Sequence, residues 1–287
     1  MDSDIKLIII GAAGYLGSCF YSKTSSFSEV CGTSSSSDRD ELTYLHLERP
    51  QQFDYARIDD RTVVLLTAAI SAPDICTREH ARAWAVNVTG TTEFINRVLA
   101  RGARIIFFST DMVYGERSDA FDETAESLPA GEYAAMKRAV EKQFLGNPLF
   151  KSIRLSYVFS HEDKFTKYLS SCAERGEEAE LFHPFYRAIV HRDDIVDGAL
   201  ALVERWDEFP QQVINFGGPA LLSRIDFAEC LRRTALPNLR FRVTEPNAAF
   251  FESRPREIAM TSPVLPNLLG RPTHTLADAV QIEFASS

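Results

Sequence analysis

Short runs of aliphatic, β-branched and aromatic residues recur through the first half of the chain, separated by longer segments with apolar residues at helical spacing. The runs predict strands at residues 6–10, 29–33, 43–47, 63–67 and 104–109. The amphipathic segments predict a helix over 81–99, which Gly102 ends, and a second helix over 133–145, which Gly146 ends. Strands that alternate with helices indicate an α/β protein, with a doubly wound parallel sheet covered by helices on both faces.

The pattern becomes looser after about residue 160, where consecutive strands are fewer. It predicts strands at 187–191 and 213–216, and helices near 165–174, 195–205, 225–233 and 276–284. We place a domain boundary between 155 and 162. Residues 1–158 then form the first domain, and residues 159–287 form mainly a smaller C-terminal α/β region for substrate, parts of which return to the first domain.

The composition argues against several classes of protein. With 287 residues and 45% hydrophobic content, the chain can bury a full core. The net charge of −9 disfavours a nucleic-acid-binding protein, because phosphate neutralisation requires a basic surface. No apolar run approaches the roughly 20 residues that span a bilayer, and the acidic start at residues 1–4 differs from a secretory signal. We therefore expect a cytoplasmic protein without a membrane partner.

Cysteine and histidine positions argue against a metal centre. The five cysteines are scattered singly, without a Cys-x-x-Cys pair, and the six histidines show no metal-ligand spacing. We expect no metal and no disulfide framework, and we interpret the thiols as buried side chains.

The stretch IIIGAAGYLG, residues 8–17, runs from a predicted strand into glycines at three-residue spacing. When Gly11, Gly14 and Gly17 lie between a strand and a helix, backbone N–H groups at the helix N-terminus can face a pyrophosphate without obstruction by side chains. The alternative is a tight strand-to-helix turn with glycines for packing. The position at the first strand favours a Rossmann-type dinucleotide site.

The end of the second predicted strand bears on the choice of cofactor. An acidic residue there would bind the ribose 2′-hydroxyl of NAD, but this chain has Ser34 and Ser35, followed by Arg39. Serine hydroxyls and a guanidinium suit a 2′-phosphate, so we prefer NADP(H), with NAD(H) as the second choice. Asp38 complicates the choice, because it could pair with Arg39 or face the ribose; the alternative is a solvated serine loop.

Candidate catalytic residues follow the fifth predicted strand. Thr110 lies at the carboxyl end of that strand, and Tyr133 and Lys137 lie one helical turn apart on one face of a helix. Reduction of a ketone needs a hydride from the nicotinamide and a proton, which Tyr133 can donate. The Lys137 ammonium and the oxidised nicotinamide ring should lower the pKa of Tyr133, while Thr110 binds the same substrate oxygen. Lys137 can also reach the nicotinamide ribose.

These motifs together resemble the extended short-chain dehydrogenase/reductases, through GAAGYLG, LLTAAISAPD, VNVTGT, STDMVYGE and YAAMK. Within that superfamily the chain is most similar to the dTDP-4-dehydrorhamnose reductase branch, through STD, IVHRDDIVDGAL and SRPREIAM. The resemblance implies that Thr110, Tyr133 and Lys137 are catalytic. It also implies that the cofactor is lined by Gly11, Gly14, Tyr15, Leu16, Gly17, Thr67, Ala68, Ala69 and Asn87. Asn87 has an alternative role, as a polar helix residue that bonds a neighbouring loop.

Position 112 distinguishes neighbouring chemistries. The related 4,6-dehydratases carry Asp-Glu after the threonine, because elimination of water needs a base and an acid. Here Asp111 is followed by Met112, whose side chain cannot transfer a proton. Both are candidate substrate contacts, and Asp111 has an equal claim to a structural role. The candidates for binding a nucleotide pyrophosphate are Arg187, Arg192, Arg254 and Arg256, each with a surface ion pair as the alternative.

The sequence therefore predicts an NADPH-dependent reductase of a keto group on a nucleotide-linked deoxysugar, with Tyr133 as proton donor. One alternative is a nucleotide-sugar epimerase. Another is a non-catalytic NADP-binding regulatory subunit, as in the β subunit of methionine adenosyltransferase in the same branch. The resemblance also suggests pairing into a homodimer through the helices at 81–99 and 133–145, although the oligomeric state stays open.

Overall fold

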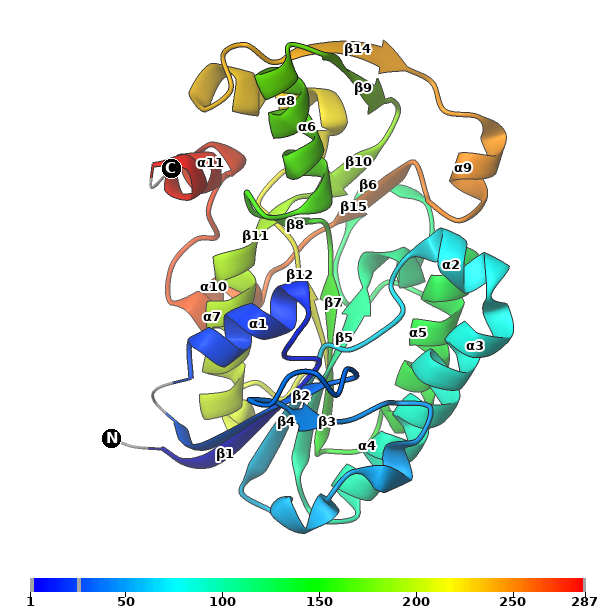
Figure 1. Cartoon of the computed structure of the whole chain (residues 1–287), viewed down its shortest axis with the longest axis vertical. Helices are drawn as coiled ribbons and strands as arrows, with labels where there is room; N and C mark the ends of the chain where they lie inside the picture. The colour runs from blue at the N-terminus through cyan, green and yellow to red at the C-terminus, as the bar shows by residue number, and fades with distance from the viewer. Residues whose placement is uncertain (1–2, 25–26, 286–287) are drawn as a thin grey trace.

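A computed structural model describes residues 3–24 and 27–285. Its centre is a seven-stranded parallel sheet in the order β12-β7-β5-β4-β1-β2-β3 (Figure 1). The strands are β1 (Ser3–Ile10), β2 (Phe27–Ser34), β3 (Thr43–Tyr44), β4 (Thr62–Leu66), β5 (Arg104–Thr110), β7 (Phe150–Leu155) and β12 (Val213–Phe216). The strand order reverses beside β1, where open α/β sheets form their ligand crevice. The prediction of a doubly wound α/β fold is confirmed.

Helices cover both faces of this sheet (Figure 1). One face carries α1 (Tyr15–Ser22), α7 (Arg192–Glu204) and α10 (Leu265–Leu269), and the other carries α2 (Pro73–Arg78), α3 (His80–Trp84), α4 (Thr91–Leu99) and α5 (Gly131–Phe144). Successive residues of β1 alternate between two apolar clusters, with Leu7 and Ile9 in one and Ile8 and Ile10 in the other. Burial on both faces explains why the strand appears in the sequence as a continuous apolar run.

The helix predicted over 81–99 is interrupted in the structure. A π-helical turn at Ala85–Gly90 separates α3 from α4. Directly after this turn the Thr91 hydroxyl of α4 donates back to the carbonyl of Val86, at 2.8 Å. At its end Gly90 packs directly on the backbone of Leu47, where a Cβ atom would lie 1.5 Å from the carbonyl oxygen. The π-helical turn therefore occurs where the helix touches the distant Leu47 segment. The amphipathic pattern of the sequence does not predict this interruption of the helix.

The hydrophobic pattern does not predict β7, because Lys151, Ser152 and Arg154 interrupt it. All three side chains are nevertheless buried. Arg154 donates to both carboxylate oxygens of Glu141, at 3.0 and 2.7 Å, and the Ser152 hydroxyl donates to the same carboxylate, at 2.9 Å. Lys151 Nζ donates to the carbonyl of Gln211, at 3.1 Å. Buried partners from other elements thus allow a polar segment to form an interior strand of the sheet.

The second region lies beyond the carboxyl ends of the sheet strands (Figure 1). It contains a four-stranded sheet in the order β13-β10-β15-β6 and the strand pairs β11-β8 and β14-β9. These strands are β6 (Arg117–Phe121), β8 (Val158–Phe159), β9 (Glu178–Phe182), β10 (Tyr186–Ala188), β11 (Val190–His191), β13 (Leu221–Ser223), β14 (Arg240–Thr244) and β15 (Glu257–Met260). Its helices are α6 (Lys164–Arg175), α8 (Arg224–Thr234), α9 (Ala248–Glu252) and α11 (Leu276–Phe284).

Segments cross between the two regions in both directions. The late strand β12 completes the main sheet, whereas the early strand β6 pairs with β15 in the second region. The strand predicted at 187–191 is divided at Ile189 into β10 and β11, which belong to different sheets. The domain boundary at 155–162 stays a prediction. Because β12 pairs in the main sheet and β6 pairs in the second region, neither region is formed by one continuous segment of the chain.

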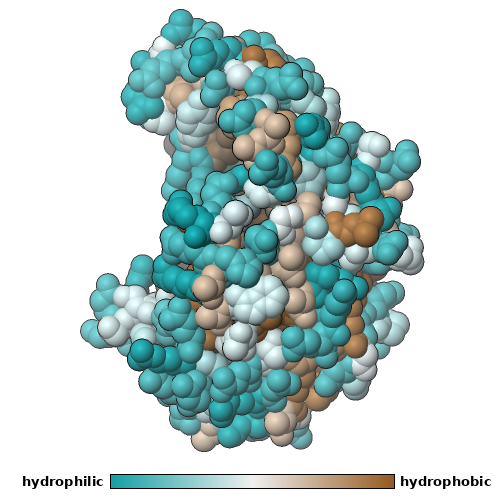
Figure 2. Space-filling model, turned by 90° about the vertical axis from the view of Figure 1, so that its right-hand side faces the viewer, coloured by the Kyte–Doolittle hydropathy of each residue, from teal (hydrophilic) through white to brown (hydrophobic). Residues whose placement is uncertain are grey.

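The face of the molecule seen in Figure 2 is mostly polar. On the side formed by α2 and α3, hydrophilic residues cover most of the surface and hydrophobic ones gather in small patches (Figure 2). Within residues 3–24 and 27–285, no helix has the length and apolarity needed to cross a bilayer. The first two residues of the acidic N-terminus, Met1 and Asp2, lie outside the described residues.

Candidate functional site

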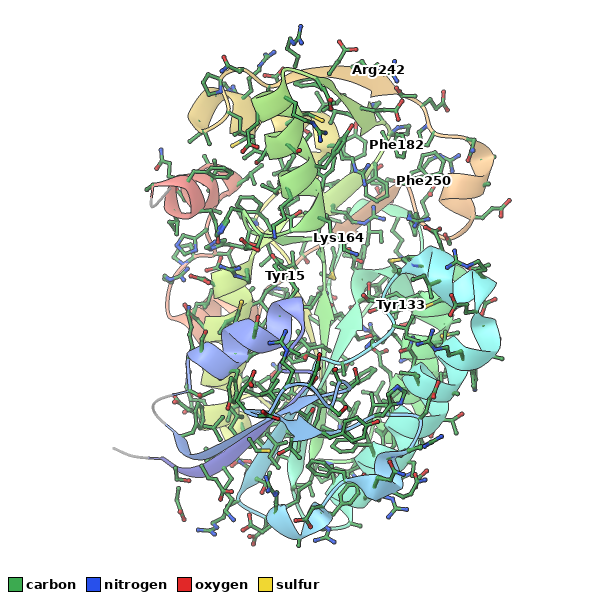
Figure 3. The ribbon with its side chains drawn as sticks, viewed as in Figure 1. Tyr15, Tyr133, Lys164, Phe182, Arg242 and Phe250 are labelled. Atoms are coloured by element: carbon green, nitrogen blue, oxygen red, sulfur yellow. The ribbon has the colours of Figure 1, made fainter. Side chains whose placement is uncertain are left out.

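A cleft of about 620 Å³ opens at the carboxyl ends of the main-sheet strands. Most of the residues expected around a cofactor line it: Gly11, Gly14, Tyr15, Leu16, Gly17, Ser34, Ser35, Thr67, Ala68, Ala69, Tyr133 and Lys137. Figure 3 shows Tyr15 and Tyr133 on opposite sides of this sheet edge, below Phe182 and Phe250 of the second region. Residues far apart in sequence therefore face one concave surface.

The turn between β1 and α1 requires its glycines. Gly11 has a φ of +91°, in the left-handed region, and donates its N–H to the Thr33 hydroxyl at 3.1 Å. A Cβ atom at Gly17 would lie 2.1 Å from the carbonyl oxygen of Gly11. The absence of side chains brings this turn close to the first turn of α1, whose free N–H groups suit the phosphates of a dinucleotide.

The end of β2 differs from its sequence-based interpretation at one position. Ser34 and Ser35 line the cleft, and the buried Ser34 hydroxyl accepts from the N–H of Ser36 at 3.0 Å. Arg39 lies outside the lining, exposed, with Nη1 3.8 Å from Glu41. Arg82, which the sequence analysis did not identify, lines the cleft instead.

No local pattern in the sequence marks Arg82, because only the tertiary structure shows which face of its helix meets the cleft. Arg82 lies one helical turn before Val86, which also lines the cleft, so both residues share one helix face. Arg82 pairs with Glu79 at 3.0 Å and lies 3.9 Å from Glu48. This position puts a cationic side chain at the same cleft as the serines.

Asn87 lies behind the cleft rather than in its lining. Its side-chain amide donates to the carbonyl of Ile70 at 2.9 Å and accepts from the N–H of the same residue at 2.8 Å. Asn87 is buried, so these two bonds satisfy a polar group in the interior. They fix the loop after β4, whose residues Thr67, Ala68 and Ala69 face the cleft.

Tyr133 and Lys137 enter the cleft from α5. Lys137 Nζ donates to the carbonyl of Phe108 at 2.7 Å and lies 5.8 Å from the centre of the Tyr133 ring. Burial lowers the pKa of Lys137 to about 8. Burial also raises the pKa of Tyr133, and the nearby Cys76 and Asp111 act in the same direction. The chain alone therefore does not lower the tyrosine pKa as expected, because removal from water dominates and the ammonium bonds a carbonyl.

Thr110 and Asp111 lie just beneath the cleft surface. Thr110 ends β5, and its hydroxyl accepts from the N–H of Met112 at 3.3 Å. Asp111 is buried; it accepts from the Ser156 hydroxyl at 2.9 Å and lies 3.8 Å from Nε of Arg187. Burial raises the pKa of Asp111, an effect that Arg187 opposes.

The arginines expected to bind a pyrophosphate have protein partners. Arg187 is buried and donates to the carbonyls of Tyr186 and Pro255, at 2.6 and 2.7 Å. Arg254 binds both carboxylate oxygens of Asp74, at 2.9 and 2.6 Å. Arg256 lies over the Phe251 ring at 4.1 Å and 3.8 Å from Glu116. Arg192 belongs to a separate polar cluster, which is described below.

A small second cavity lies beside Arg187. Its lining includes Phe165, Phe185 and Arg224, a residue that the sequence analysis missed. The Arg224 guanidinium lies 4.6 Å from the centre of the Phe165 ring and 4.7 Å from that of Phe185. Its position directly after the helix-capping Ser223 gave no local signal of this stacking. In the described part of the chain, no group of three or more His, Cys, Asp or Glu side chains is arranged to hold a metal ion.

Comparisons with known proteins agree with this architecture. The RmlD substrate binding domain family matches residues 5–275. A dTDP-4-dehydrorhamnose reductase from Mycobacterium tuberculosis is 30% identical over 161 residues, which are 54% of this chain and 51% of that protein. The chain thus matches about half the length of this curated relative.

Solved structures share the fold along nearly the whole chain. A dTDP-4-dehydrorhamnose reductase from Clostridium acetobutylicum superposes with a TM-score of 0.80 at 21% identity, covering 98% of this chain and 99% of that one. A UDP-glucuronic acid 4-epimerase from Bacillus cereus, solved with a fluorinated UDP-sugar and NAD, has a TM-score of 0.81 at 20% identity and 98% coverage of both chains. At these identities the likeness establishes the fold.

Proposed function

The chain belongs to the RmlD substrate binding domain family, and from this premise we propose that it is an NADPH-dependent reductase of a keto group on a nucleotide-linked deoxysugar. The observation that carries the proposal is the single cleft that joins the glycine turn to Tyr133 and Lys137. The turn has the open backbone that a dinucleotide phosphate requires, and the helix supplies a proton donor beside it. This combination supports reduction at a carbonyl.

Each residue of the proposed catalytic set has its own task. A bound nicotinamide dinucleotide supplies a hydride to the carbonyl carbon of the substrate. Tyr133 gives its phenolic proton to the carbonyl oxygen, and Thr110 holds that oxygen by a hydrogen bond. Lys137 would contribute positive charge near the phenol and could donate a further hydrogen bond to the nicotinamide ribose of a bound cofactor. Lys137 is buried and Tyr133 is half-buried in the cleft wall, so the protein limits the access of water to this pair.

The preference for NADP(H) over NAD(H) remains part of the proposal. Ser34 and Ser35 line the cleft without an acidic residue, and Arg82 adds a cation that can approach a 2′-phosphate together with Arg39. Titration with NADPH and NADH tests this choice. Replacement of Arg82 or Arg39 by Ala should weaken NADPH binding more than NADH binding; equal losses for the two cofactors would contradict the assignment.

We propose a nucleotide sugar as substrate because the related reductase is named for dTDP-4-dehydrorhamnose and the epimerase was solved with a UDP-sugar. Arg187, Arg254 and Arg256 are the proposed contacts for its phosphates or sugar, with Asp111 and Met112 nearer the reacting carbon. The epimerase neighbours keep a 4-epimerase as the alternative activity. A regulatory role is less favoured, because a regulator needs no proton donor beside a buried lysine. Cytoplasmic location and homodimer formation remain predictions.

Tyr133→Phe tests the proposal directly. The variant should lose turnover of a nucleotide-linked 4-keto sugar by about 100-fold or more, because the proton donor is removed, while cofactor affinity changes little. The assay follows NADPH absorbance, with fluorescence titration for binding. Tyr168→Phe, on the distant helix α6, is the matched control. Full turnover by Tyr133→Phe would exclude Tyr133 as the proton donor. If the unaltered protein isomerises the sugar without net oxidation of NADPH, the activity is that of an epimerase.

A further inference from the structure

The two walls of the cofactor cleft are connected by one hydrogen bond. Tyr15 is the first residue of α1 and follows Gly14 of the glycine turn. Its hydroxyl lies 2.6 Å from the hydroxyl of Ser160, which follows β8. Val158 of β8 lines the same cleft as Tyr15. The bond therefore links the first turn of α1 to the segment that follows β8.

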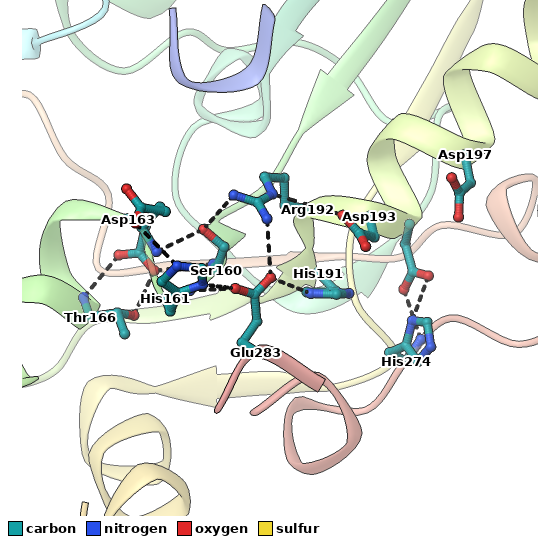
Figure 4. Close-up of polar contacts among 12 residues, drawn as sticks. Ser160, His161, Asp163, Thr166, His191, Arg192, Asp193, Asp197, His274 and Glu283 are labelled. Atoms are coloured by element: carbon teal, nitrogen blue, oxygen red, sulfur yellow. Dashed lines mark hydrogen bonds and ion pairs between the residues drawn. The ribbon is translucent and has the colours of Figure 1, made fainter. Parts of the chain in front are cut away.

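Ser160 is itself held by Arg192, as Figure 4 shows. It is fully buried, and its hydroxyl accepts from Nη1 of Arg192, at 3.4 Å. Arg192 begins α7, and its Nη2 donates to the carboxylate of Glu283, at 3.4 Å. A chain of polar contacts thus runs from the C-terminal helix α11 through α7 and β8 to the first turn of α1.

Glu283 is the anchor of this chain. It is buried, and its carboxylate accepts from Nε2 of His191, at 2.9 Å, and from the N–H of His161, also at 2.9 Å (Figure 4). The His161 ring binds the same carboxylate. These donors and Arg192 hold the pKa of Glu283 at about 2, far below its ordinary value, despite the opposing effect of burial. The carboxylate is therefore charged throughout the neutral range.

A second acid completes the surroundings of His191. His274 lies edge-on to the His191 ring, with centroids 5.4 Å apart, and its Nδ1 is 2.7 Å from Asp194. Asp194 also pairs with Arg271, at 2.8 Å. The imidazole of His191 is thus enclosed between two charged clusters. Rotation of His191 away from Glu283 would break its 2.9 Å contact with that carboxylate and disturb its packing against His274.

The geometry points to Glu283 as a positioning residue for the cofactor cleft: we propose that it fixes the first turn of α1 through Arg192, Ser160 and Tyr15, and so strengthens dinucleotide binding. The inference rests on the proposed function of the cleft. A prepositioned α1 terminus costs the ligand less ordering on binding, which is how a remote contact can raise affinity. The family match ends at residue 275, so α11 lies outside it.

A double-variant cycle tests this link on the full chain. Tyr15→Phe removes the terminal hydroxyl, Glu283→Gln removes the anchoring charge, and Glu204→Gln, at an exposed site ending α7, is the matched control. We expect each single variant to weaken NADPH binding about threefold to tenfold, the range for one lost hydrogen bond. The double variant should lose no more than the weaker-binding single variant, because both interrupt the same chain.

Amide hydrogen exchange of residues 11–17 in the cofactor-free protein provides a second readout. Both single variants should accelerate it, and Glu204→Gln should not. Losses of affinity that multiply in the double variant, or exchange that stays unchanged, would overturn the inference. If Glu283→Gln does not fold, Arg192→Met interrupts the chain at its middle and takes its place in the cycle.

Failure of the proposed function is separately visible. Absence of NADPH and NADH binding by the unaltered protein would overturn the cofactor assignment. The exchange measurement would still decide whether Glu283 positions the turn: faster exchange in both variants supports the link, and unchanged exchange removes it.

Discussion

Lys137 combines a proposed catalytic task with an unfavourable environment. Its Nζ atom lies 4.5 Å from the centre of the Phe107 ring, and its hydrogen bond goes to a backbone carbonyl. Glu141, one helical turn further along α5, favours the charged amine, but burial outweighs this effect and lowers the pKa to about 8. The buried Lys137 ammonium therefore destabilises the folded protein, and such unfavourable groups are typical of sites that carry out chemistry.

This cost predicts a pH dependence of stability. The unfolded chain keeps the Lys137 proton up to about pH 10.5, whereas the folded chain loses it near pH 8. Between these values the unfolded state binds more protons, so the unfolding free energy rises with pH, by about 3 kcal/mol for a shift of this size. Lys137→Met lacks this contribution. In denaturant unfolding between pH 7 and 10.5, the unfolding free energy of the wild-type protein should therefore rise relative to that of the variant. If the unfolding free energies of the two proteins change in parallel with pH, the buried lysine charge is contradicted.

The residue-level hypotheses depended on residue type and local spacing. The glycines at 11, 14 and 17 and the Tyr133–Lys137 pair lie where their spacing indicates, because both patterns are short-range properties of one turn and one helix. The predictions for Arg39 and Asn87 depend instead on tertiary structure, because the first needs the position of a loop and the second the orientation of a helix face. Arg39 is exposed beside Glu41, and Asn87 bonds the loop behind the cleft.

At the scale of elements, Gly90 shows how tertiary contact alters a helix. By propensity, Ala in place of Gly stabilises a helix interior by up to about 1 kcal/mol. Gly90, however, ends the π-helical turn against the Leu47 carbonyl, where a Cβ atom has no space. Close packing of the helix on that backbone requires glycine there.

Gly90→Ala should therefore destabilise the protein, by about 1–3 kcal/mol, because the helix must move away from the Leu47 backbone. Leu47 also lines the cofactor cleft, so dinucleotide affinity should fall as well. Urea unfolding and NADPH titration measure the two effects. Asn96→Ala, at an exposed position of α4, should leave both nearly unchanged. Greater stability of Gly90→Ala would show that propensity outweighs the contact.

At the scale of the whole molecule, contacts across the two regions close the site. Asp74 of α2 and Arg254 after α9 are far apart in sequence, yet their side chains form a two-point ion pair. Arg254 also lies over the Phe250 ring, at 4.9 Å. In the proposed function, the carboxylate of Asp74 competes with substrate phosphate for the same guanidinium.

Asp74→Asn should consequently raise affinity for a nucleotide diphosphate sugar, seen as a lower KM with little change in kcat. Its effect on the unfolding free energy should stay within about 1 kcal/mol, because the Asp74 side chain is largely exposed and screened by water. Steady-state kinetics and thermal unfolding test both parts, with the exposed Asp60→Asn as control. An unchanged KM would remove Arg254 from the proposed substrate contacts.

The sequence by itself determined the α/β class, most of the helices, most strands of the main sheet and the local form of the glycine turn, because hydrophobic periodicity and glycine geometry act between near neighbours. Only the tertiary structure decided features that depend on distant partners. The polar strand β7 requires Glu141, the exchange of β6 and β12 joins two regions, and Glu283 reaches Tyr15 through Arg192 and Ser160. Which buried polar group meets which partner follows from packing in three dimensions, and no local pattern along the chain encodes it.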